Sequence, residues 1–411
     1  MLLKTYWGGF LHNSCLPLEL TLNLCSHRCA YCFANLNSPN RKVEDEDLDA
    51  TLNLLQDFRN RNSYEAWLLQ QGYGVVFSNK TDPFAVSNER ADLSLRLIEL
   101  MQLQGIPIAF QTKGGRKAMA ALKMLDRQSV WYISLATLDE DIVRRVEPGA
   151  PSIEERFEFI ASLKAAGQEV VVGINPVVPD WLSDPQALCD RLARLGVSGA
   201  WVQSMHLSHR QVENMKPREM EALGERVIHQ AMHPDLHPEV AKCVDLTRAA
   251  VVASGMEVYS NQQREASHFF APWKSLYPKR FPQMQDFVNY CHANKQDGDL
   301  IHWPEFRDFF VPQLPQGDRG LRDHLNASVA VGVLNGKWIP QRMTYEGLLK
   351  WIWQIKEIPF CPANTECFAI AADKIPGTES DWEVWTDEDD LPFLVFCPNG
   401  SDGSAFVQWN P

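Results

Sequence analysis

Hydrophobic and polar positions along the first two thirds of the chain alternate between two patterns. Short unbroken apolar runs, typical of buried strands, are followed by longer segments whose apolar residues recur at helical spacing. One of these segments opens with the capping-box pattern Ser152-x-x-Glu155 and is followed by Gly167, so we expect a helix over residues 152–166. The predicted strands are 18–24, 74–78, 106–110, 130–135, 169–174 and 199–203, and the predicted helices are 47–60, 88–104, 116–126, 152–166 and 185–195.

Repeated strand–helix units predict a parallel sheet with right-handed crossovers. Six units indicate an α/β fold, a partial (β/α)6 TIM-type barrel that occupies residues 1–265. After the sixth strand the pattern is helical over 217–232 and 238–254, and one more strand is expected at 256–261.

The character of the sequence changes beyond about residue 266. Eight of the 13 tryptophans lie here, and prolines are frequent. A helix is expected at 345–355, and the acidic segment 381–390 is expected to be solvated. We therefore predict a smaller α+β domain over residues 266–411 that covers the active site.

Composition excludes some classes of protein. The formal charge of −13 argues against broad affinity for duplex DNA, although Lys113, Arg116 and Lys117 could form a local basic groove. No apolar run is long enough to span a bilayer, and the first residues do not resemble a signal peptide, so no membrane association is expected. Ten cysteines without a secretory signal indicate metal chemistry in a reducing compartment, and we expect a cytoplasmic protein.

Three of these cysteines, Cys25, Cys29 and Cys32, form a C-x3-C-x2-C pattern directly after the first predicted strand. Zinc sites and ferredoxin clusters usually have four protein ligands, and this segment offers three. The spacing suits three corners of an iron–sulfur cube with one iron left open. The alternatives are three buried structural cysteines or a partial zinc site.

With the aromatic Tyr31 between its last two thiols, the segment resembles the signature of the radical S-adenosylmethionine (SAM) enzymes. The resemblance implies that Cys25, Cys29 and Cys32 hold a [4Fe-4S] cluster whose open iron binds SAM. One electron from the cluster then cleaves a carbon–sulfur bond and gives methionine and a 5′-deoxyadenosyl radical. A reductase, flavodoxin or ferredoxin would supply the electron.

Polar or special residues also follow the other predicted strands, at the edge where ligands bind in parallel sheets. They lie at 78–84, 111–115, 134–137, 175–179 and 203–206. Five stretches resemble one branch of the superfamily, the spore photoproduct lyase-like proteins, also labelled DNA repair photolyases. These are 25–34, 81–84, 111–113, Ser134 followed by 147–152 and Arg156, and 175–179.

That resemblance implies roles by position. Tyr31 would lie near the adenine of SAM, and Thr81, Lys113 and Ser134 match positions that contact SAM. Lys113 would face the methionyl carboxylate, for which an ammonium group is a suitable partner. The resemblance also suggests DNA or a modified nucleotide as the substrate.

One position departs from the lyase pattern. Asn79 stands where the lyase has the cysteine that returns a hydrogen atom to the product. An amide does not readily donate a hydrogen atom, so a rearrangement of a modified thymine that regenerates SAM fits better than dimer reversal. The alternatives are a radical enzyme that modifies a peptide or a metabolite, and a non-catalytic iron–sulfur or metal-binding protein.

Other candidate chemistry lies outside this pattern. Four thiols could ligate an auxiliary cluster, although buried structural cysteines are the more common case. His206 and His209 could bind a metal or be solvated, and the tryptophans could stack unpaired bases or fill a core. The four thiols are Cys291, Cys361, Cys367 and Cys397.

Overall fold

A computed structural model describes most of the chain. The described residues are 2–5, 18–22, 25–37, 45–78, 81–85, 92–260, 267–268, 270–279, 282–314, 343–354, 361–378, 381–400 and 406–407. They divide into two compact units that are interleaved along the chain. Unit 1 comprises Met1–Leu3, Leu18–Phe58 and Gly72–Lys279, and unit 2 comprises Lys4–Pro17, Arg59–Gln71 and Arg280–Pro411.

A nine-stranded sheet is the centre of unit 1. Its strands follow one another in sequence order, and every described pairing from β2 to β9 is parallel. Among the described residues no pairing joins β9 back to β1, so the sheet is open, and the predicted partial barrel is confirmed. The strands are β1 (Leu3–Thr5), β2 (Leu18–Leu20), β3 (Val75–Phe77), β4 (Ile108–Thr112), β5 (Val130–Ser134), β6 (Glu169–Val177), β7 (Gly199–Ser204), β8 (Glu257–Ser260) and β9 (Ser267–His268).

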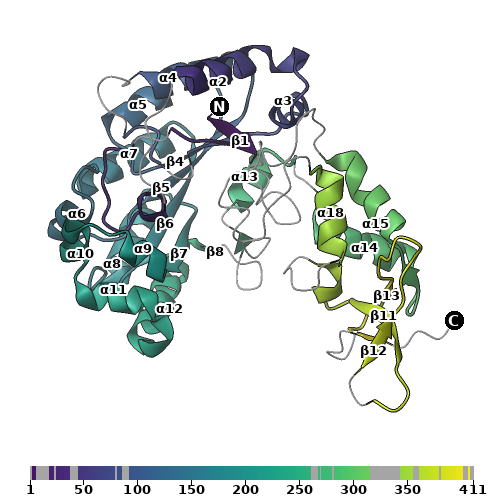
Figure 1. The fold of residues 1–411 in the computed structure, drawn as a ribbon. Coiled ribbons are helices and arrows are strands. Elements are labelled where there is room, and N and C mark those ends of the chain that lie inside the picture. The colour runs from purple at the N-terminus through teal and green to yellow at the C-terminus, as the bar shows by residue number, and fades with distance from the viewer. Residues whose placement is uncertain are drawn as a thin grey trace. The chain divides into compact units, whose positions relative to one another are not determined.

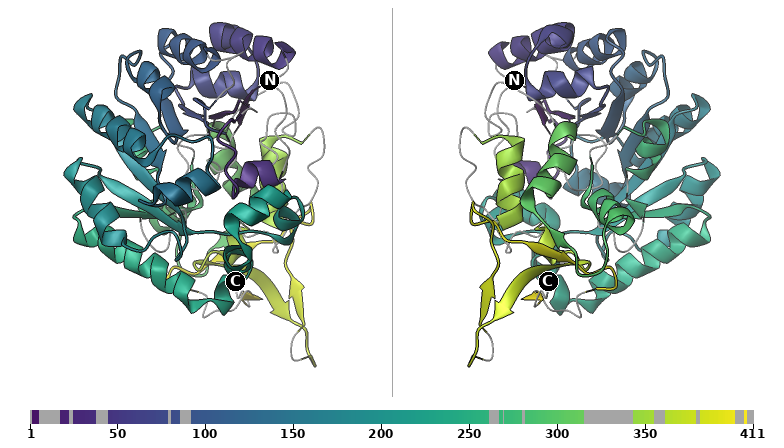
Figure 2. Two further views of the ribbon diagram at one scale, coloured as in Figure 1. Left: turned by 90° about the vertical axis from the view of Figure 1, so that its left-hand side faces the viewer. Right: turned by 90° about the vertical axis from the view of Figure 1, so that its right-hand side faces the viewer.

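Amphipathic helices cover the outer face of this sheet (Figures 1 and 2). Helix α7 packs on β6, and α12 packs on β7, β8 and α8. The capping box predicted at Ser152 and Glu155 is present, because each residue's side chain accepts from the other's backbone N–H. The helices are α2 (Asp45–Asp57), α4 (Leu93–Leu103), α5 (Arg116–Leu122), α6 (Glu140–Val146), α7 (Ile153–Ala165), α8 (Pro185–Arg194) and α12 (Pro238–Ala253).

Aromatic side chains stack across neighbouring strands in the core of unit 1. Phe77 is paired in register with Phe110, and Phe110 with Trp131. The Phe110 and Trp131 rings stack with centroids 4.0 Å apart, and Phe159 of α7 packs edge-on against Trp131. Equal registers on successive parallel strands therefore bring three aromatic residues into one layer.

The single helix predicted at 217–232 is wrong. Gly224 adopts a φ of 80°, a left-handed conformation that glycine reaches without steric cost, and it divides the segment into α10 (Pro217–Leu223) and α11 (Glu225–Met232). Several short helices were also not predicted, because each offers too few turns for a clear period. They include α1 (Phe33–Asn37), α3 (Tyr64–Gln70), α6, α9 (His209–Glu213) and α13 (Ala271–Leu276).

Unit 2 combines helices with a small, mainly antiparallel sheet, consistent with the predicted α+β class. The strand order is β10-β13-β11-β12, and β14 pairs parallel to β11. Phe287, Phe306, Phe310 and Trp353 are buried and pack against one another, so several aromatic residues of this half fill a core. Its elements include α14 (Met284–Asn294), α15 (Trp303–Phe310), α18 (Tyr345–Gln354), β10 (Leu300–Ile301), β11 (Phe368–Lys374), β12 (Trp382–Val384), β13 (Leu394–Phe396) and β14 (Phe406–Val407).

Candidate functional site

The cysteine loop follows β2 and leads directly into α1. Cys29 is buried, and Cys25 and Cys32 are half-buried; all three are free thiols. Burial raises the pKa of the Cys25 thiol to about 11, with Asp82 adding to the rise. Burial also raises the pKa of Cys29, and the neighbouring thiols contribute, while Lys113 opposes the change.

Two other loops of unit 1 hold the cysteine loop through its backbone. Ser26 N–H donates to the carbonyl oxygen of Ala85 at 2.7 Å, and Ala30 N–H donates to that of Val146 at 2.8 Å. Gly149 N–H donates to the His27 carbonyl oxygen at 3.0 Å. These bonds fix the path of the chain on both sides of Cys29.

The His27 side chain joins the same two loops. Its Nδ1 lies 2.8 Å from the carbonyl oxygen of Gly149, and its Nε2 lies 3.0 Å from Asp82 Oδ2. Both ring nitrogens thus face acceptor oxygens, an arrangement that an imidazolium with two N–H groups satisfies. His27 therefore acts as a bridge between the loops after β3 and after α6.

Asp82 is the acceptor at the centre of this bridge. Besides His27, its buried carboxylate accepts from the Thr112 hydroxyl at 2.9 Å, from Lys113 N–H at 2.6 Å and from Phe84 N–H at 2.9 Å. Burial alone would raise the pKa of Asp82, but His27 and these backbone donors lower it below its ordinary value. The carboxylate therefore ties β4 to the cysteine loop.

A second buried network brings together three of the four residues predicted to contact SAM. The Lys113 ammonium lies 2.7 Å from Glu147 Oε1, 2.9 Å from Ser134 Oγ and 3.1 Å from the Tyr31 hydroxyl. The Tyr31 hydroxyl also donates to Glu147 Oε1. Lys113 and Glu147 are 8% and 3% exposed, so this is an ion pair inside the protein.

Arg156 of α7 completes the network from the other side of Glu147. It donates to Glu147 Oε2, to the Ser134 carbonyl oxygen at 3.2 Å and to the Pro151 carbonyl oxygen at 3.0 Å. Burial alone would raise the pKa of Glu147, but Lys113 and Arg156 beside it lower that pKa well below its ordinary value. The carboxylate is thus held ionised between two cations.

Thr81, the fourth predicted contact, lies apart from this network. Its hydroxyl donates to the Leu22 carbonyl oxygen and lies 3.1 Å from Ser78 Oγ. Within the described part of the chain, no hydrogen bond joins Thr81 to Lys113 or Ser134. Asn79, which stands at the position of the lyase's hydrogen-donor cysteine, lies outside the described residues.

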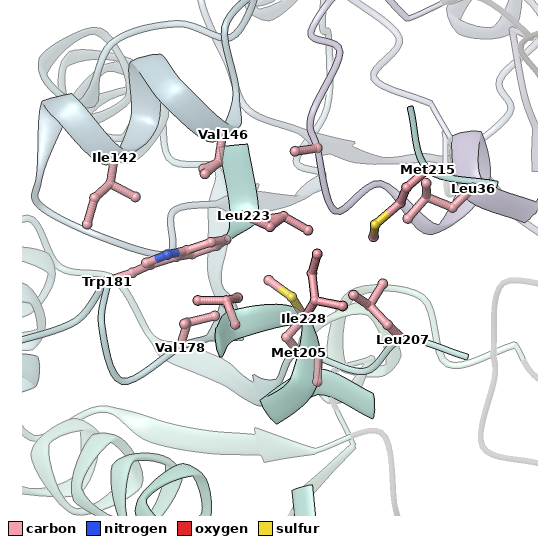
Figure 3. Close-up of a cluster of buried hydrophobic side chains, with 13 residues drawn as sticks. Leu36, Ile142, Val146, Val178, Trp181, Met205, Leu207, Met215, Leu223 and Ile228 are labelled. Atoms are coloured by element: carbon pink, nitrogen blue, oxygen red, sulfur yellow. The ribbon is translucent and has the colours of Figure 1, made fainter. Parts of the chain in front are cut away.

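Figure 3 shows a cluster of buried apolar side chains from several elements, and the partly buried Tyr31 packs against this cluster. The Tyr31 and Trp181 ring centroids are 5.7 Å apart. Helices α9, α10 and α11 supply or border part of the cluster, and Asn214 at the end of α9 donates to the Leu36 carbonyl oxygen of α1 at 2.8 Å. The helical segment after β7 therefore supports the helix that follows the cysteine loop. Buried members include Leu36, Ile142, Val146, Val178, Trp181, Met205, Leu207, Met215, Leu223 and Ile228.

The residues at the site fit an iron–sulfur cluster and SAM by their chemistry. Three reduced thiols on one loop are soft ligands of the kind that such clusters take. Beside them lie an ammonium, a hydroxyl and a phenol, which suit a ligand with carboxylate and ribose groups. Among the described residues, no three His, Cys, Asp or Glu side chains converge as the ligands of a single metal ion would.

The thiols of unit 2 have ordinary structural surroundings. All four are buried. The Cys361 thiol donates to the Trp353 carbonyl oxygen at 3.7 Å, and the Cys397 thiol to that of Val395 at 3.8 Å. Burial raises the pKa of Cys291 to about 12 and that of Cys367 to about 11. An auxiliary cluster at these thiols remains a sequence-based hypothesis.

No role was predicted from the sequence for His27, Asp82, Glu147 or Arg156. All four lie inside the stretches that carried the family resemblance, and that was the available signal. Glu147 and Arg156 lie nine positions apart, but His27 reaches Asp82 across 55 positions and Glu147 reaches Lys113 across 34, so the spacing of residues could not reveal these contacts.

Comparison with known proteins adds to this geometry. Residues 20–191 match the sequence profile of the Radical SAM superfamily. An uncharacterised protein of Mycobacterium tuberculosis is 29% identical over 227 residues, which cover 50% of this chain and 64% of that protein. A protein of Pseudomonas phage M6 named radical SAM Nalpha-GlyT isomerase is 29% identical over 177 residues, 42% of this chain and 35% of its own length.

Among solved structures, a mutant spore photoproduct lyase with bound AdoMet and dinucleoside spore photoproduct is similar, with a TM-score of 0.45 and 14% identity. The match covers 61% of this chain and 78% of the lyase.

Within the described part of the chain, no helix is long and apolar enough to cross a membrane.

Proposed function

We propose that this protein is a radical SAM enzyme that rearranges a substrate by hydrogen abstraction, with residues 20–191, which match the superfamily profile, as its radical SAM domain. The superfamily uses a [4Fe-4S] cluster and SAM. When bound, these two groups supply the reductive cleavage of a carbon–sulfur bond and the hydrogen-atom abstraction. The protein supplies the binding, the orientation and the exclusion of water.

The observation that carries this proposal is the meeting of Tyr31, Lys113 and Ser134 beside the cysteine loop. In this proposal Cys25, Cys29 and Cys32 hold the cluster. The Lys113 ammonium binds the methionyl carboxylate, and the Ser134 hydroxyl is positioned by Lys113 to bond a polar group of SAM. Tyr31 lies near the adenine, and Thr81 supports the site from the loop after β3.

We propose an isomerisation of a modified thymine as the reaction. Two observations support it: the phage relative is named an isomerase, and Asn79 replaces the thiol donor of the lyase pattern. An isomerisation returns the abstracted hydrogen atom to the same molecule, so no separate thiol donor is required. With a net charge of −13, the protein is expected to favour a nucleotide or an exposed base over long duplex DNA.

The first experiment tests the radical SAM activity itself. The protein is reconstituted anaerobically with iron and sulfide and then incubated with SAM and dithionite, with flavodoxin or ferredoxin as the alternative reductant. We expect about four irons per chain and formation of 5′-deoxyadenosine. An iron-loaded protein that forms none would support the non-catalytic alternative.

The second experiment tests the substrate class. Oligonucleotides and nucleosides that carry deuterated modified thymines are compared with deuterated peptides. If the reaction is an isomerisation, the product should have the same elemental composition as the substrate, and deuterium should appear in the recovered SAM. Turnover of peptides alone would replace the nucleotide proposal with the peptide alternative.

A further inference from the structure

Glu147 lies at the centre of the buried network, although the proposed chemistry assigns it no task. It ends helix α6, where its backbone N–H donates to the Val143 carbonyl oxygen at 2.8 Å. Its two carboxylate oxygens are divided between partners from three separate segments. Oε1 accepts from Lys113 and Tyr31, and Oε2 accepts from Arg156.

The three donors of Lys113 are fully used. A lysine ammonium has three N–H groups, and Lys113 faces three acceptors: Glu147, Ser134 and Tyr31. To bind a ligand carboxylate, Lys113 must exchange one of these partners. Tyr31 and Ser134 are neutral, whereas Glu147 is charged and makes the shortest of the three contacts with Lys113, so Glu147 is the partner that Lys113 retains.

The charges in the network explain why a carboxylate belongs at this position. Two cations, Lys113 and Arg156, surround one carboxylate, and the three residues are 8%, 1% and 3% exposed in the order Lys113, Arg156 and Glu147. The set carries a net charge of +1, which favours the arrival of an anion at Lys113. Without Glu147, two buried cations would lie near each other with no shared acceptor.

We propose that Glu147 is a positioning residue for SAM: it fixes the Lys113 ammonium and the Tyr31 hydroxyl at the cofactor site and anchors both to helix α7 through Arg156. This inference rests on the proposed function, because the methionyl carboxylate is the ligand that Lys113 would take. In this proposal Glu147 acts through Lys113 and Tyr31, the residues to which its carboxylate is hydrogen-bonded.

The test is a double-mutant cycle with E147Q and K113M, read by equilibrium binding of SAM to the iron-loaded protein. The amide of E147Q keeps the shape of the side chain but replaces one acceptor with a donor, so Lys113 or Arg156 loses its acceptor. We expect E147Q to keep the wild-type iron content and to bind SAM about tenfold more weakly, the scale of one charge-assisted hydrogen bond. In the K113M background, E147Q should change the dissociation constant less than about twofold.

A spectroscopic readout separates positioning from a general structural role. The electron paramagnetic resonance spectrum of the reduced cluster should be the same in E147Q and wild type without SAM. The SAM-induced change in that spectrum should require higher SAM concentrations in E147Q. Glu154→Gln is the matched control, since Glu154 on the same helix as Arg156 makes an exposed pair with Arg191 and should leave both readouts unchanged.

Two results would overturn the inference. One is wild-type affinity for SAM in E147Q, and the other is an equal loss of affinity with and without Lys113.

If E147Q does not fold, E147Q/R156Q removes both members of the buried pair, which costs less than removing one. The same tenfold loss is expected there, and its absence would count against the proposal. A wild-type protein that binds iron but not SAM would refute the proposed function as well, whereas wild-type binding with an unaffected E147Q would refute this inference alone.

Discussion

Replacing Gly149 with alanine should detach the cysteine loop from the loop that follows α6. A Cβ atom at this position would lie 2.2 Å from the Ser26 carbonyl oxygen and 3.0 Å from His27 Cα. Both are backbone atoms, so no side-chain rotation can relieve the contact. The two segments would have to separate by about 1 Å to reach normal van der Waals distance.

The expected loss of docking free energy follows from the hydrogen bonds that join the cysteine loop to the loop after α6. The hydrogen bond from Gly149 N–H to the His27 carbonyl oxygen is 3.0 Å long, and the contact of His27 Nδ1 with the Gly149 carbonyl oxygen is 2.8 Å long. Separation by about 1 Å takes both beyond hydrogen-bonding range, at about 1 kcal/mol each. Steric overpacking adds about 1–3 kcal/mol, so G149A should weaken loop docking by about 3–5 kcal/mol.

Because domains of this kind are commonly stable by about 5–15 kcal/mol, the fold should survive while the loop moves. The assay is the iron content per chain after anaerobic reconstitution, with urea unfolding measured in parallel. G149A should lose most of its iron. Gly173→Ala is the matched control, because its nearest neighbour would be Trp201 Cε3 at 3.8 Å, an ordinary contact. Wild-type iron content in G149A would refute the reasoning.

Three further predictions concern the thiols, the buried carboxylate and the core. Replacing any one of the three thiols in loop 25–32 with alanine should abolish most cluster absorbance, whereas C291A should retain it; equal absorbance in all variants would contradict the assigned ligands. Because the pKa of Glu147 is lowered in the folded protein, its contribution to stability is complete above the unfolded value of about 4.5 and is lost as the pH falls through the folded pKa. E147Q should therefore flatten the dependence of the unfolding free energy on pH below about 4.5, and an unchanged slope would contradict this. G74A should lower the unfolding free energy by about 1–3 kcal/mol, because its Cβ would lie 2.3 Å from Trp273 Cζ2; urea titration would test it, and an unchanged midpoint would show that Trp273 moves freely.

Part of the fold was predictable because its signals are local. Runs such as 130–135 and the capping box at Ser152 are read within a few residues, and both appear where they were expected. Strands β1 and β9, of three and two residues, were not predicted. The break at Gly224 was missed because the apolar spacing on either side continues the helical pattern; only the backbone conformation distinguishes a divided helix from a continuous one.

The sequence by itself determined the alternating α/β architecture, the three thiols on one loop and the polar residues that follow the strands. Only the tertiary structure decided which of those residues meet. Lys113 pairs with Glu147 across 34 positions of the chain, and His27 reaches Gly149 across 122. Such pairs form because parallel strands bring the loops after their carboxyl ends to one edge of the sheet, and there burial requires every charge to find a partner. The spacing of residues along the chain does not predict which of these side chains pair.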